Sequence, residues 1–380
     1  MSVFCRYCVG MVFLWLGGLA PLASVASSAG NVRGVTFFYL DGKQQDFPWV
    51  LEHQREPAVR ARIENLFAQY RAAEVNWIRL LIATNHFPDR SAIHPVPSPS
   101  LIQKVNDFMA LTRSGANAGQ FTVELVLVPE QKNSRFTDTA PYERDKRWYK
   151  AWLDHLDYSN LGMVMFGGDL SPCLLSGGEG APGSESIPQN HSAWIKALWD
   201  WKVANYPNLY ASYEVIGIQT GSRNDPMLIQ KLARWIKVHT PNVPVVSVSL
   251  YLELPRGSSW RDYADTTAQI IDTYNATSNI PLWIDEFGKS WGNDWALEDQ
   301  TAAFTGFLTT TIAWQHKSPY PVLVWVGGND APYDGKNTFG LVAGFEESKP
   351  LMQPAWEELG RFYHLNAGEA GQRQNGRKEP

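Results

Sequence analysis

The stretch that decides the fold is IPLWIDEFG, residues 280–288. An apolar run of strand length ends in two neighbouring carboxylates, Asp285 and Glu286, and a glycine follows at which the chain can turn. A buried acid at the tip of a strand costs free energy unless it is paired or used in chemistry. The stretch therefore predicts a buried strand with a functional Glu286 at its open end. Because strand side chains alternate between two faces, we expect Asp285 to point the other way, toward a helix.

Similar runs, rich in β-branched and aromatic residues, recur along the chain with amphipathic segments between them. The eight predicted strands cover residues 32–40, 76–82, 121–128, 162–166, 213–218, 243–252, 281–286 and 321–326. The seven helices predicted between them cover 59–73, 100–112, 142–156, 192–205, 226–239, 260–275 and 297–316. Regular alternation of helix and strand predicts βαβ units with a parallel sheet, and eight strands are the number that a TIM barrel needs. We therefore predict an α/β fold, a (β/α)₈ TIM barrel in a single catalytic domain. A doubly wound open sheet is the alternative, although no Gly-rich phosphate loop follows the first strand.

The beginning of the chain is typical of an export signal. Arg6 precedes an apolar run over residues 9–20, and a small-residue stretch follows it over 23–29. This order predicts a signal peptide over residues 1–29 that is cleaved after Ala26 or Ala29. An uncleaved membrane anchor is the alternative, but the run is short for a span of about 20 residues. We expect a secreted or periplasmic protein with no stable membrane insertion after cleavage.

The rest of the chain is predicted to hold one domain and a tail. Residues 30–367 are enough for one large core, and the polar, apolar-poor residues 368–380 predict a disordered tail. Of the three cysteines, only Cys173 lies outside the signal, so we expect neither a disulfide nor a cysteine metal site in the exported chain.

Composition narrows the class of partner. The formal net charge is -5 and the Lys and Arg residues form no cluster, which argues against a nucleic-acid partner. Sixteen Trp are consistent with sugar binding through exposed rings, although many will pack in the core. The sequence has no HExxH motif and no phosphate loop, so we expect no metal and no organic cofactor. No oligomeric state is predicted.

Several of the strand motifs resemble those of one large clan, the retaining TIM-barrel glycosidases that include the cellulase and mannanase families. IPLWIDEFG is similar to the strand that carries their nucleophile. VRGVTFFYL (32–40), NWIRLLI (76–82), VVSVSLY (245–251) and VLVWV (322–326) resemble their first, second, sixth and eighth strands. The resemblance implies that Glu286 is the nucleophile, that Arg79 and Tyr251 hydrogen-bond to it, and that Trp325 forms a platform beneath the sugar.

Each implied role has a physical reason and a structural alternative. Arg79 would keep the carboxylate ionised, Tyr251 would orient it as a neutral donor, and Trp325 would stack on the sugar and exclude water. Alternatively, Arg79 is a structural ion-pair residue and the two aromatics fill the mouth of the barrel.

The sequence departs from the clan at strand four. Retaining hydrolysis needs a second carboxyl group about 5 Å from the nucleophile, and the resemblance implies an Asn-Glu pair at the end of this strand. Gly168 and Asp169 stand there instead. Asp169 is our candidate for the acid, although its shorter side chain could lengthen the separation, which would favour inversion.

Other residues compete for that role. A second alignment makes Asp225 the acid, but it requires residues 162–166 to be strand three and leaves 121–128 unmatched, so the strand count favours Asp169. Glu130, just past strand three, is a further candidate for the acid. Gln219, at the tip of strand five, is a candidate for binding substrate.

The leading functional hypothesis is hydrolysis or transglycosylation of a β-linked polysaccharide or oligosaccharide outside the cytoplasm. A catalytically degenerate, glycan-binding barrel in an exopolysaccharide system is the alternative, and the missing Asn-Glu pair is its main support. An inverting or rearranged glycosidase that uses Asp169 is a third possibility. The fold alone does not separate them, because barrels of this kind carry many functions.

Overall fold

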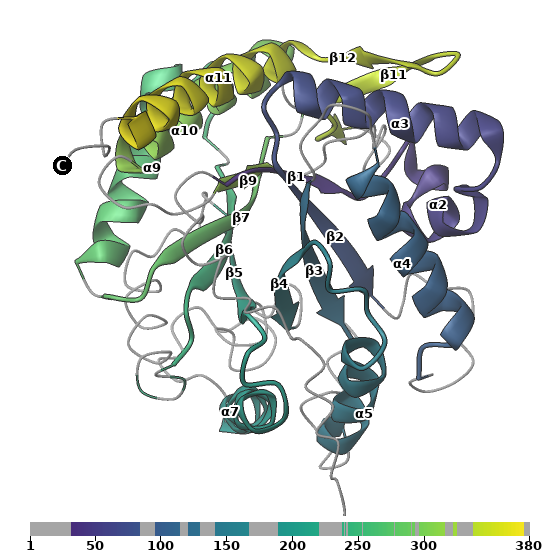
Figure 1. Ribbon diagram of the computed structural model, residues 1–380. Helices are drawn as coiled ribbons and strands as arrows, with labels where there is room; N and C mark the ends of the chain where they lie inside the picture. Colours follow the sequence, from purple (N-terminus) through teal and green to yellow (C-terminus); the bar gives the residue numbers. More distant parts are fainter. Residues whose placement is uncertain are drawn as a thin grey trace, which may run out of the picture.

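The centre of the protein is a barrel of parallel strands surrounded by helices (Figure 1). The computed structural model describes residues 32–83, 96–114, 121–129, 141–166, 189–219, 238, 240, 242–252, 254–276, 278–289, 291–292, 296–315, 322–324 and 337–375. The barrel strands are β1 (Arg33–Phe37), β2 (Trp77–Ala83), β3 (Thr122–Val128), β4 (Leu161–Phe166), β5 (Ala211–Gln219), β6 (Val246–Tyr251), β7 (Leu282–Gly288) and β9 (Val322–Val324).

The strand pairing closes the sheet on itself. Each strand pairs in parallel with the next one along the chain, and β9 pairs with both β7 and β1. All eight predicted strands are confirmed, and so is the α/β class. The pairing is that of a barrel and not that of the doubly wound open sheet.

Helices follow the strands along the chain. They are α3 (Pro57–Ala72), α4 (Pro99–Arg113), α5 (Pro141–Leu153), α7 (Gln189–Asn205), α9 (Trp260–Asn275), α10 (Leu297–Gln315) and α11 (Pro354–Asn375). Six of the seven predicted helices are thereby confirmed, whereas the one predicted over 226–239 falls almost entirely outside the described residues. The connection after β1 holds two extra short helices, η2 (Lys43–Gln45) and α2 (Phe47–His53).

The barrel wall separates two apolar clusters. A large cluster fills the space between the strands and the helices, because the strands are apolar on both faces. A smaller cluster fills the barrel interior with Val32, Trp77, Ala83, Val126, Val128, Met163, Met165, Val245 and Trp283. The interior is therefore packed with side chains, and it leaves room for polar chemistry only toward the carboxyl ends of the strands.

Gly162 allows one close contact in this interior. A Cβ atom on Gly162 would lie 2.5 Å from Trp77 Cη2 and 2.3 Å from Thr122 Cγ2. At Gly162 the register between β3 and β4 also shifts, so that Val123 pairs with Leu161 but Glu124 pairs with Met163. The glycine therefore lets the Trp77 ring lie across the barrel against Trp283, with ring centroids 5.4 Å apart.

The C-terminal helix secures the first strand. Tyr363 of α11 donates a hydrogen bond to the Gly34 carbonyl of β1 over 3.1 Å, and Trp356 packs on Tyr70 of α3. The helix continues to Asn375, so the expectation of a disordered tail from residue 368 is wrong for residues 368–375, and 376–380 lie outside the described residues.

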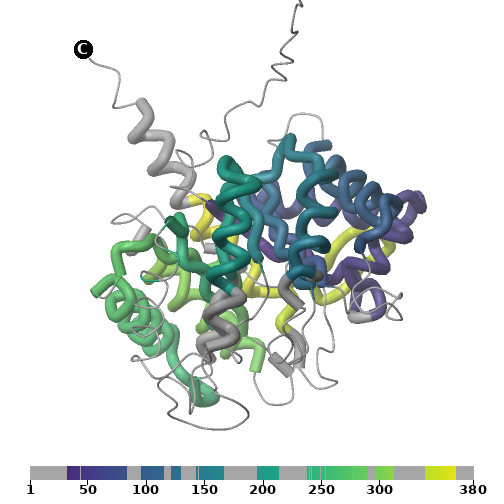
Figure 2. The backbone as a smooth tube through the Cα atoms, turned by 90° about the horizontal axis from the view of Figure 1, so that it is seen from below, coloured from purple at the N-terminus to yellow at the C-terminus, as the bar shows by residue number. Residues whose placement is uncertain are grey.

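A hairpin between β9 and α11 was not predicted. Its strands, β11 (Val342–Glu346) and β12 (Lys349–Met352), lie beside α3, as Figures 1 and 2 both show. Arg62 Nε donates to the Glu347 carbonyl over 2.9 Å, and Asn65 Nδ2 donates to the Ser348 carbonyl over 3.0 Å. Two further strands of two residues each, β8 (Trp291–Gly292) and β10 (Asn337–Thr338), pair in a short antiparallel ladder after β7.

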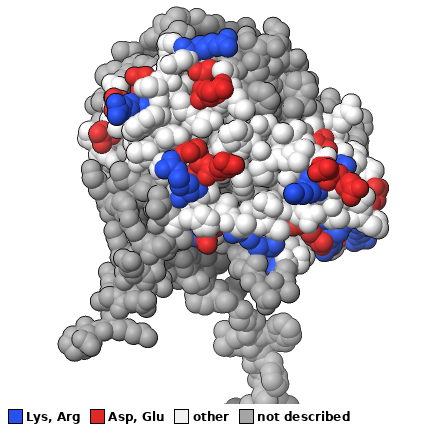
Figure 3. Space-filling model, turned by 90° about the horizontal axis from the view of Figure 1, so that it is seen from above, with Lys and Arg blue, Asp and Glu red and all other residues white. Residues whose placement is uncertain are grey.

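The outer surface carries charges of both signs. On the face in Figure 3, Lys and Arg lie next to Asp and Glu. Some ion pairs lie within one helix, as between Arg60 and Glu64 on α3. No helix in the described ranges is long and apolar enough to cross a membrane.

Candidate functional site

The candidate site lies near the ends of β6 and β7, at the carboxyl edge of the barrel, with Arg79 of β2 beneath it. Parallel barrels hold their active sites at this edge, because the strand ends and the loops after them converge there. Glu286, near the end of β7, is 9% exposed, while the strand residues below it are sealed in the barrel. The Glu286 side chain therefore remains partly accessible, whereas the strand residues beneath it do not.

Two donors hold the carboxylate of Glu286. Arg79 Nη1 of β2 donates to Oε1, and the hydroxyl of Tyr251 at the end of β6 donates to Oε2 over 2.5 Å. The Arg79 guanidinium is fully buried, and so it is oriented by its surroundings and not by solvent. The structure thus brings Glu286 together with the two residues expected to hydrogen-bond to it, Arg79 and Tyr251, with one donor for each oxygen.

Phe339 adds an aromatic wall to this edge. Its ring lies 5.9 Å from the Tyr251 ring, edge-on, and its carbonyl accepts a hydrogen bond from Gln300 of α10 over 3.4 Å. Gln300 also donates to the Lys289 carbonyl over 2.9 Å, which ties the segment after β7 to the one after β10. Sequence analysis did not single out Phe339, because it lies in a connection without a strand or helix pattern.

Asp285 departs from the sequence prediction. Between β6 and β7, Val248 pairs with Ile284 but Ser249 pairs with Glu286, so β7 holds one extra residue, Asp285, at this point. An extra residue of this kind is a β-bulge, which re-aims side chains and is common beside active sites. The expected contact of Asp285 with a helix is therefore wrong, and its carboxylate lies inside the barrel, with Oδ2 3.7 Å from Arg79 Nη2.

Glu124 of β3 is a third carboxylate on the same guanidinium. Its Oε1 lies 3.3 Å from Arg79 Nε, and its Oε2 accepts a hydrogen bond from Trp77 Nε1 over 3.3 Å. Both Arg79 and Glu124 are fully buried. Sequence analysis missed Glu124, although a lone carboxylate within the apolar run TVELVLV was a signal that could have found it.

Burial changes the protonation of Asp285. Removal from water raises its pKa from 3.8 to about 7, an effect that Arg79 opposes and that the charges of Glu286 and Glu124 reinforce. Four ionisable groups thus share one enclosed space, and a proton on Asp285 limits the negative charge that Arg79 has to balance.

Several predicted residues lie outside the described ranges. They are the three candidates for the acid, Asp169, Asp225 and Glu130, and the predicted platform Trp325. Gln219 ends β5, where its backbone pairs with that of Tyr251, but its side chain is also outside the description.

The strand order nevertheless decides between the two alignments for the acid. The strand over 161–166 pairs with β3 and β5 and is the fourth of the barrel, while 211–219 is the fifth. The alignment that made 162–166 the third strand is therefore wrong, and with it the ground for placing Asp225 after strand four. Asp169 follows the fourth strand in the sequence, as the strand count required.

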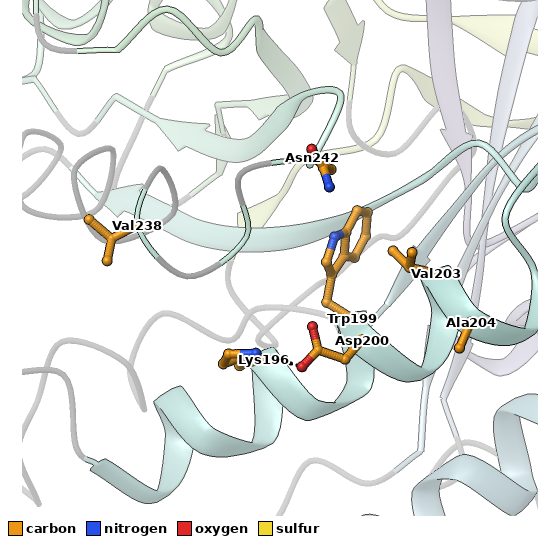
Figure 4. Close-up of a pocket in the computed structure, with 7 residues that line it drawn as sticks. All are labelled: Lys196, Trp199, Asp200, Val203, Ala204, Val238 and Asn242. Carbon is orange, nitrogen blue, oxygen red and sulfur yellow. Dashed lines mark hydrogen bonds and ion pairs between the residues drawn. The ribbon is translucent and has the colours of Figure 1, made fainter.

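A cavity elsewhere on the surface is separate from this site. It has a volume of about 410 Å³ and is lined by Lys196, Trp199, Asp200, Val203, Ala204, Val238 and Asn242 (Figure 4). These residues belong to α7 and to the segment before β6, so the cavity lies near the amino ends of β5 and β6, away from the carboxyl edge that holds Glu286. No group of three His, Cys, Asp or Glu side chains within the described ranges is arranged to hold a metal ion.

Comparison with known proteins places the fold. No protein-family model matches the sequence, and no curated protein matches it either. Among solved structures, β-glycosidase BGL167 has a TM-score of 0.62 at 12% identity, over 89% of this chain and 97% of that one. An exo-β-1,4-mannosidase from Opitutaceae bacterium strain TAV5 has a TM-score of 0.57 at 13% identity, over 90% of this chain and 62% of that one. A β-glucosidase from Thermotoga maritima has a TM-score of 0.56 at 10% identity, over 89% and 98%. In its fold, this protein is therefore similar to glycoside hydrolases.

Proposed function

We propose that this protein is an exported O-glycosyl hydrolase that acts on a β-linked polysaccharide or oligosaccharide, with a single (β/α)₈ barrel as its catalytic domain. One observation carries the proposal. Glu286, the partly exposed carboxylate at the carboxyl edge of the barrel, accepts a hydrogen bond from Arg79 on one oxygen and from Tyr251 on the other. A carboxylate held in this way is fixed in direction, and Glu286 keeps 9% of its surface exposed.

The chemistry follows from the geometry of such a carboxylate. A Glu286 oxygen attacks the anomeric carbon, the glycosidic C–O bond breaks, and an acid gives its proton to the departing oxygen. The same acid, now a base, takes a proton from water, and the water oxygen replaces Glu286 on the sugar. Tyr251 and Arg79 hold the carboxylate in place during attack and stabilise it when it leaves.

We assign the acid to Asp169 on the strand count, and the sugar platform to Trp325. Asp169 follows β4, the strand whose end faces the substrate side of such barrels opposite the nucleophile strand. Gln219, whose backbone is paired with that of Tyr251, is proposed to contact substrate from β5.

A glycan-binding protein that does not cleave its ligand is the second candidate. Gly168 and Asp169 in place of an Asn-Glu pair favour it, because Asp is one methylene shorter than Glu. It predicts that the carboxyl edge around Glu286 binds carbohydrate with no turnover, so that replacement of Glu286 changes no rate.

The test of cleavage uses purified wild-type protein, Glu286→Gln and the control Glu64→Gln on β-glucans, mannans, bacterial exopolysaccharides and aryl β-glycosides. Glu64 is an exposed residue of α3 that pairs with Arg60, so its replacement changes a carboxylate outside the site. We expect turnover by wild type and Glu64→Gln, and none by Glu286→Gln. If all three proteins are inert and bind a glycan equally well, the enzyme proposal is wrong.

Trapping identifies the nucleophile directly. A 2-deoxy-2-fluoro glycoside with a good leaving group slows the second step, so a retaining enzyme accumulates with the sugar on its nucleophile. We expect the added mass on the peptide that contains Glu286. Turnover without any label on Glu286 would point to inversion.

The acid is identified by comparing variants on substrates whose leaving groups differ. Asp169→Ala and Asp225→Ala are compared on an unactivated and an activated aryl glycoside, because a good leaving group needs little protonation. Loss of the true acid is partly rescued by the activated substrate. Rescue in Asp225→Ala and not in Asp169→Ala would contradict the assignment.

A further inference from the structure

The barrel interior holds a second set of groups beneath Glu286. Arg79 has three nitrogens, and each is directed to a different carboxylate: Nε to Glu124, Nη2 to Asp285 and Nη1 to Glu286. Glu286 alone is partly exposed, since Glu124 and Asp285 are both fully buried. Among the described residues, one cation thus faces three acids, and a full set of charges on these four groups would sum to about -2, which is costly in a buried site.

The hydrogen bonds distribute this charge unequally. Glu124 Oε2 accepts a hydrogen bond from Trp77 Nε1, and Glu124 Oε1 lies 3.3 Å from Arg79 Nε. Neither oxygen of Asp285, in contrast, has a well-formed hydrogen bond among the described residues. The nearby Ser247 hydroxyl of β6 lowers the pKa of Asp285, but burial raises it by more. Of the two buried carboxylates, Asp285 therefore has the weaker support for a negative charge among the described residues.

We propose that Asp285 is a positioning residue for Glu286, and that it acts as the proton-bearing member of the network formed by Arg79, Glu124, Asp285 and Glu286. While Asp285 is neutral, the guanidinium is shared by two anions, Glu124 and Glu286. When Asp285 ionises, a third anion competes for Arg79, and the hold of Arg79 on Glu286 weakens. The bulge in β7 makes this possible, because it lets the consecutive residues Asp285 and Glu286 both face the barrel interior. The inference rests on the proposed function only for its effect on the nucleophile, because the proton itself can be measured without a substrate.

The direction of the pH effect follows from linkage. Folding raises the pKa of Asp285 from 3.8 to about 7, so between these values the folded protein holds a proton that the unfolded chain has released. The stability that this group contributes is present below pH 3.8 and is lost as the pH rises to about 7, above which it changes no further. Within this window the unfolding equilibrium constant increases by up to about tenfold per pH unit.

Asp285→Asn tests the proton. Asparagine has nearly the shape of a neutral Asp and does not titrate, so the variant folds and loses this part of the pH dependence. Denaturant unfolding of wild type and variant is measured at pH values from 4.5 to 8, and the ratio of their unfolding constants is plotted. We expect the ratio of wild type to variant to increase up to pH 7 and then level off. A ratio that stays flat, or an Asn variant that does not fold, overturns the proposal.

Two more variants test whether the pH dependence belongs to Asp285 and whether Glu124 is part of the network. Asp262→Asn is the control, because Asp262 is exposed and its pKa is lowered by hydrogen bonds from Ser259, so it is ionised in both states throughout this range. Its curve should stay parallel to that of wild type. Glu124→Gln removes a charge that repels ionised Asp285, so the levelling point should move to lower pH. An unchanged levelling point would show that Glu124 is not part of the network.

A double-mutant cycle tests the effect on Glu286 without any turnover. Asp285→Asn, Glu286→Gln and the double variant are unfolded at pH 5.5 and at pH 8.5. We expect near-additive effects at pH 5.5, and non-additive effects at pH 8.5 that change the unfolding constant by a factor of about five or more, because the two anions then compete for Arg79. Additivity at both pH values overturns the positioning role. Failure of the proposed function would appear elsewhere, as an inert wild-type protein.

Discussion

Asp285 and Glu286 are consecutive residues of one strand, yet both carboxylates face Arg79 inside the barrel. A regular strand would send them to opposite faces, but β7 holds one extra residue against β6 at this point. On either side of the pair, Ile284 and Phe287 both pack into the outer apolar cluster. The bulge therefore gives β7 two inward carboxylates in a row, one sealed and one accessible.

This arrangement explains why one arginine is placed so deep. The guanidinium has a fixed fork of N–H groups, which can serve carboxylates in several directions at once. Lysine would offer a compact charge that cannot match three separated acids. The position on β2 thus requires arginine for its shape as well as for its charge.

Replacement of Arg79 tests this requirement. We expect Arg79→Lys to lower the free energy of unfolding by about 3–5 kcal/mol at neutral pH, because it leaves buried carboxylates poorly compensated. Arg60→Lys, which changes an exposed pair on α3, is the control and should change it by less than about 0.5 kcal/mol. Denaturant unfolding measures both. Equal effects of the two substitutions would contradict the buried network.

Tyr251→Phe tests the second donor on Glu286. The phenyl ring keeps the packing on Phe339 but removes the hydroxyl that lies 2.5 Å from Oε2. A hydrogen bond to a charged group contributes about 1.5–3 kcal/mol, so we expect kcat/KM on the best glycoside to fall roughly 10- to 100-fold. Tyr158→Phe, which removes a hydroxyl bonded to the Leu153 carbonyl away from the site, is the control. A similar fall in both variants would assign the effect to stability and not to the site.

Gly306 is expected to be essential to the packing of α10 on α9. A Cβ atom there would lie 2.1 Å from the Trp260 carbonyl oxygen and 2.9 Å from the Ala264 nitrogen, and these backbone atoms cannot rotate away. We expect Gly306→Ala to destabilise the protein by about 1–3 kcal/mol in a denaturant titration. Gly360→Ala in α11 is the matched control, because its nearest contact is an ordinary 3.6 Å to Ala73 Cβ. That variant should be more stable by up to about 1 kcal/mol, and a loss in both would refute the steric argument.

Gly162→Ala tests whether packing in the barrel interior affects the site. The added methyl group meets Trp77 and Thr122, so the ring must move, and with it the donor to Glu124. We expect a loss of about 1–3 kcal/mol in stability together with a lower kcat/KM and a changed tryptophan emission spectrum. A stability loss with normal catalysis would show that the Trp77 ring is independent of the network.

The sequence determined the strands, most of the helices and three members of the site. Buried strands are apolar along their whole length and amphipathic helices repeat every 3.6 residues, so both leave a local signal, and eight strands in a βα alternation leave few topologies. Glu286 was found as a carboxylate at the tip of a predicted strand, whereas Arg79 and Tyr251 were expected beside it because their strands resemble those of the glycosidase clan.

Tertiary structure alone decided how the strands are set against one another. The two-residue period placed Asp285 on the wrong face, because a bulge depends on the register between β6 and β7, which one strand does not encode. Glu124 and Trp77 are 47 residues apart in the chain, and their contact exists only because β2 and β3 pair side by side. The protonation of Asp285 depends in turn on burial and on charges from three strands. Local pattern thus fixed which residue is the accessible acid, whereas the closed barrel decided which groups share its arginine.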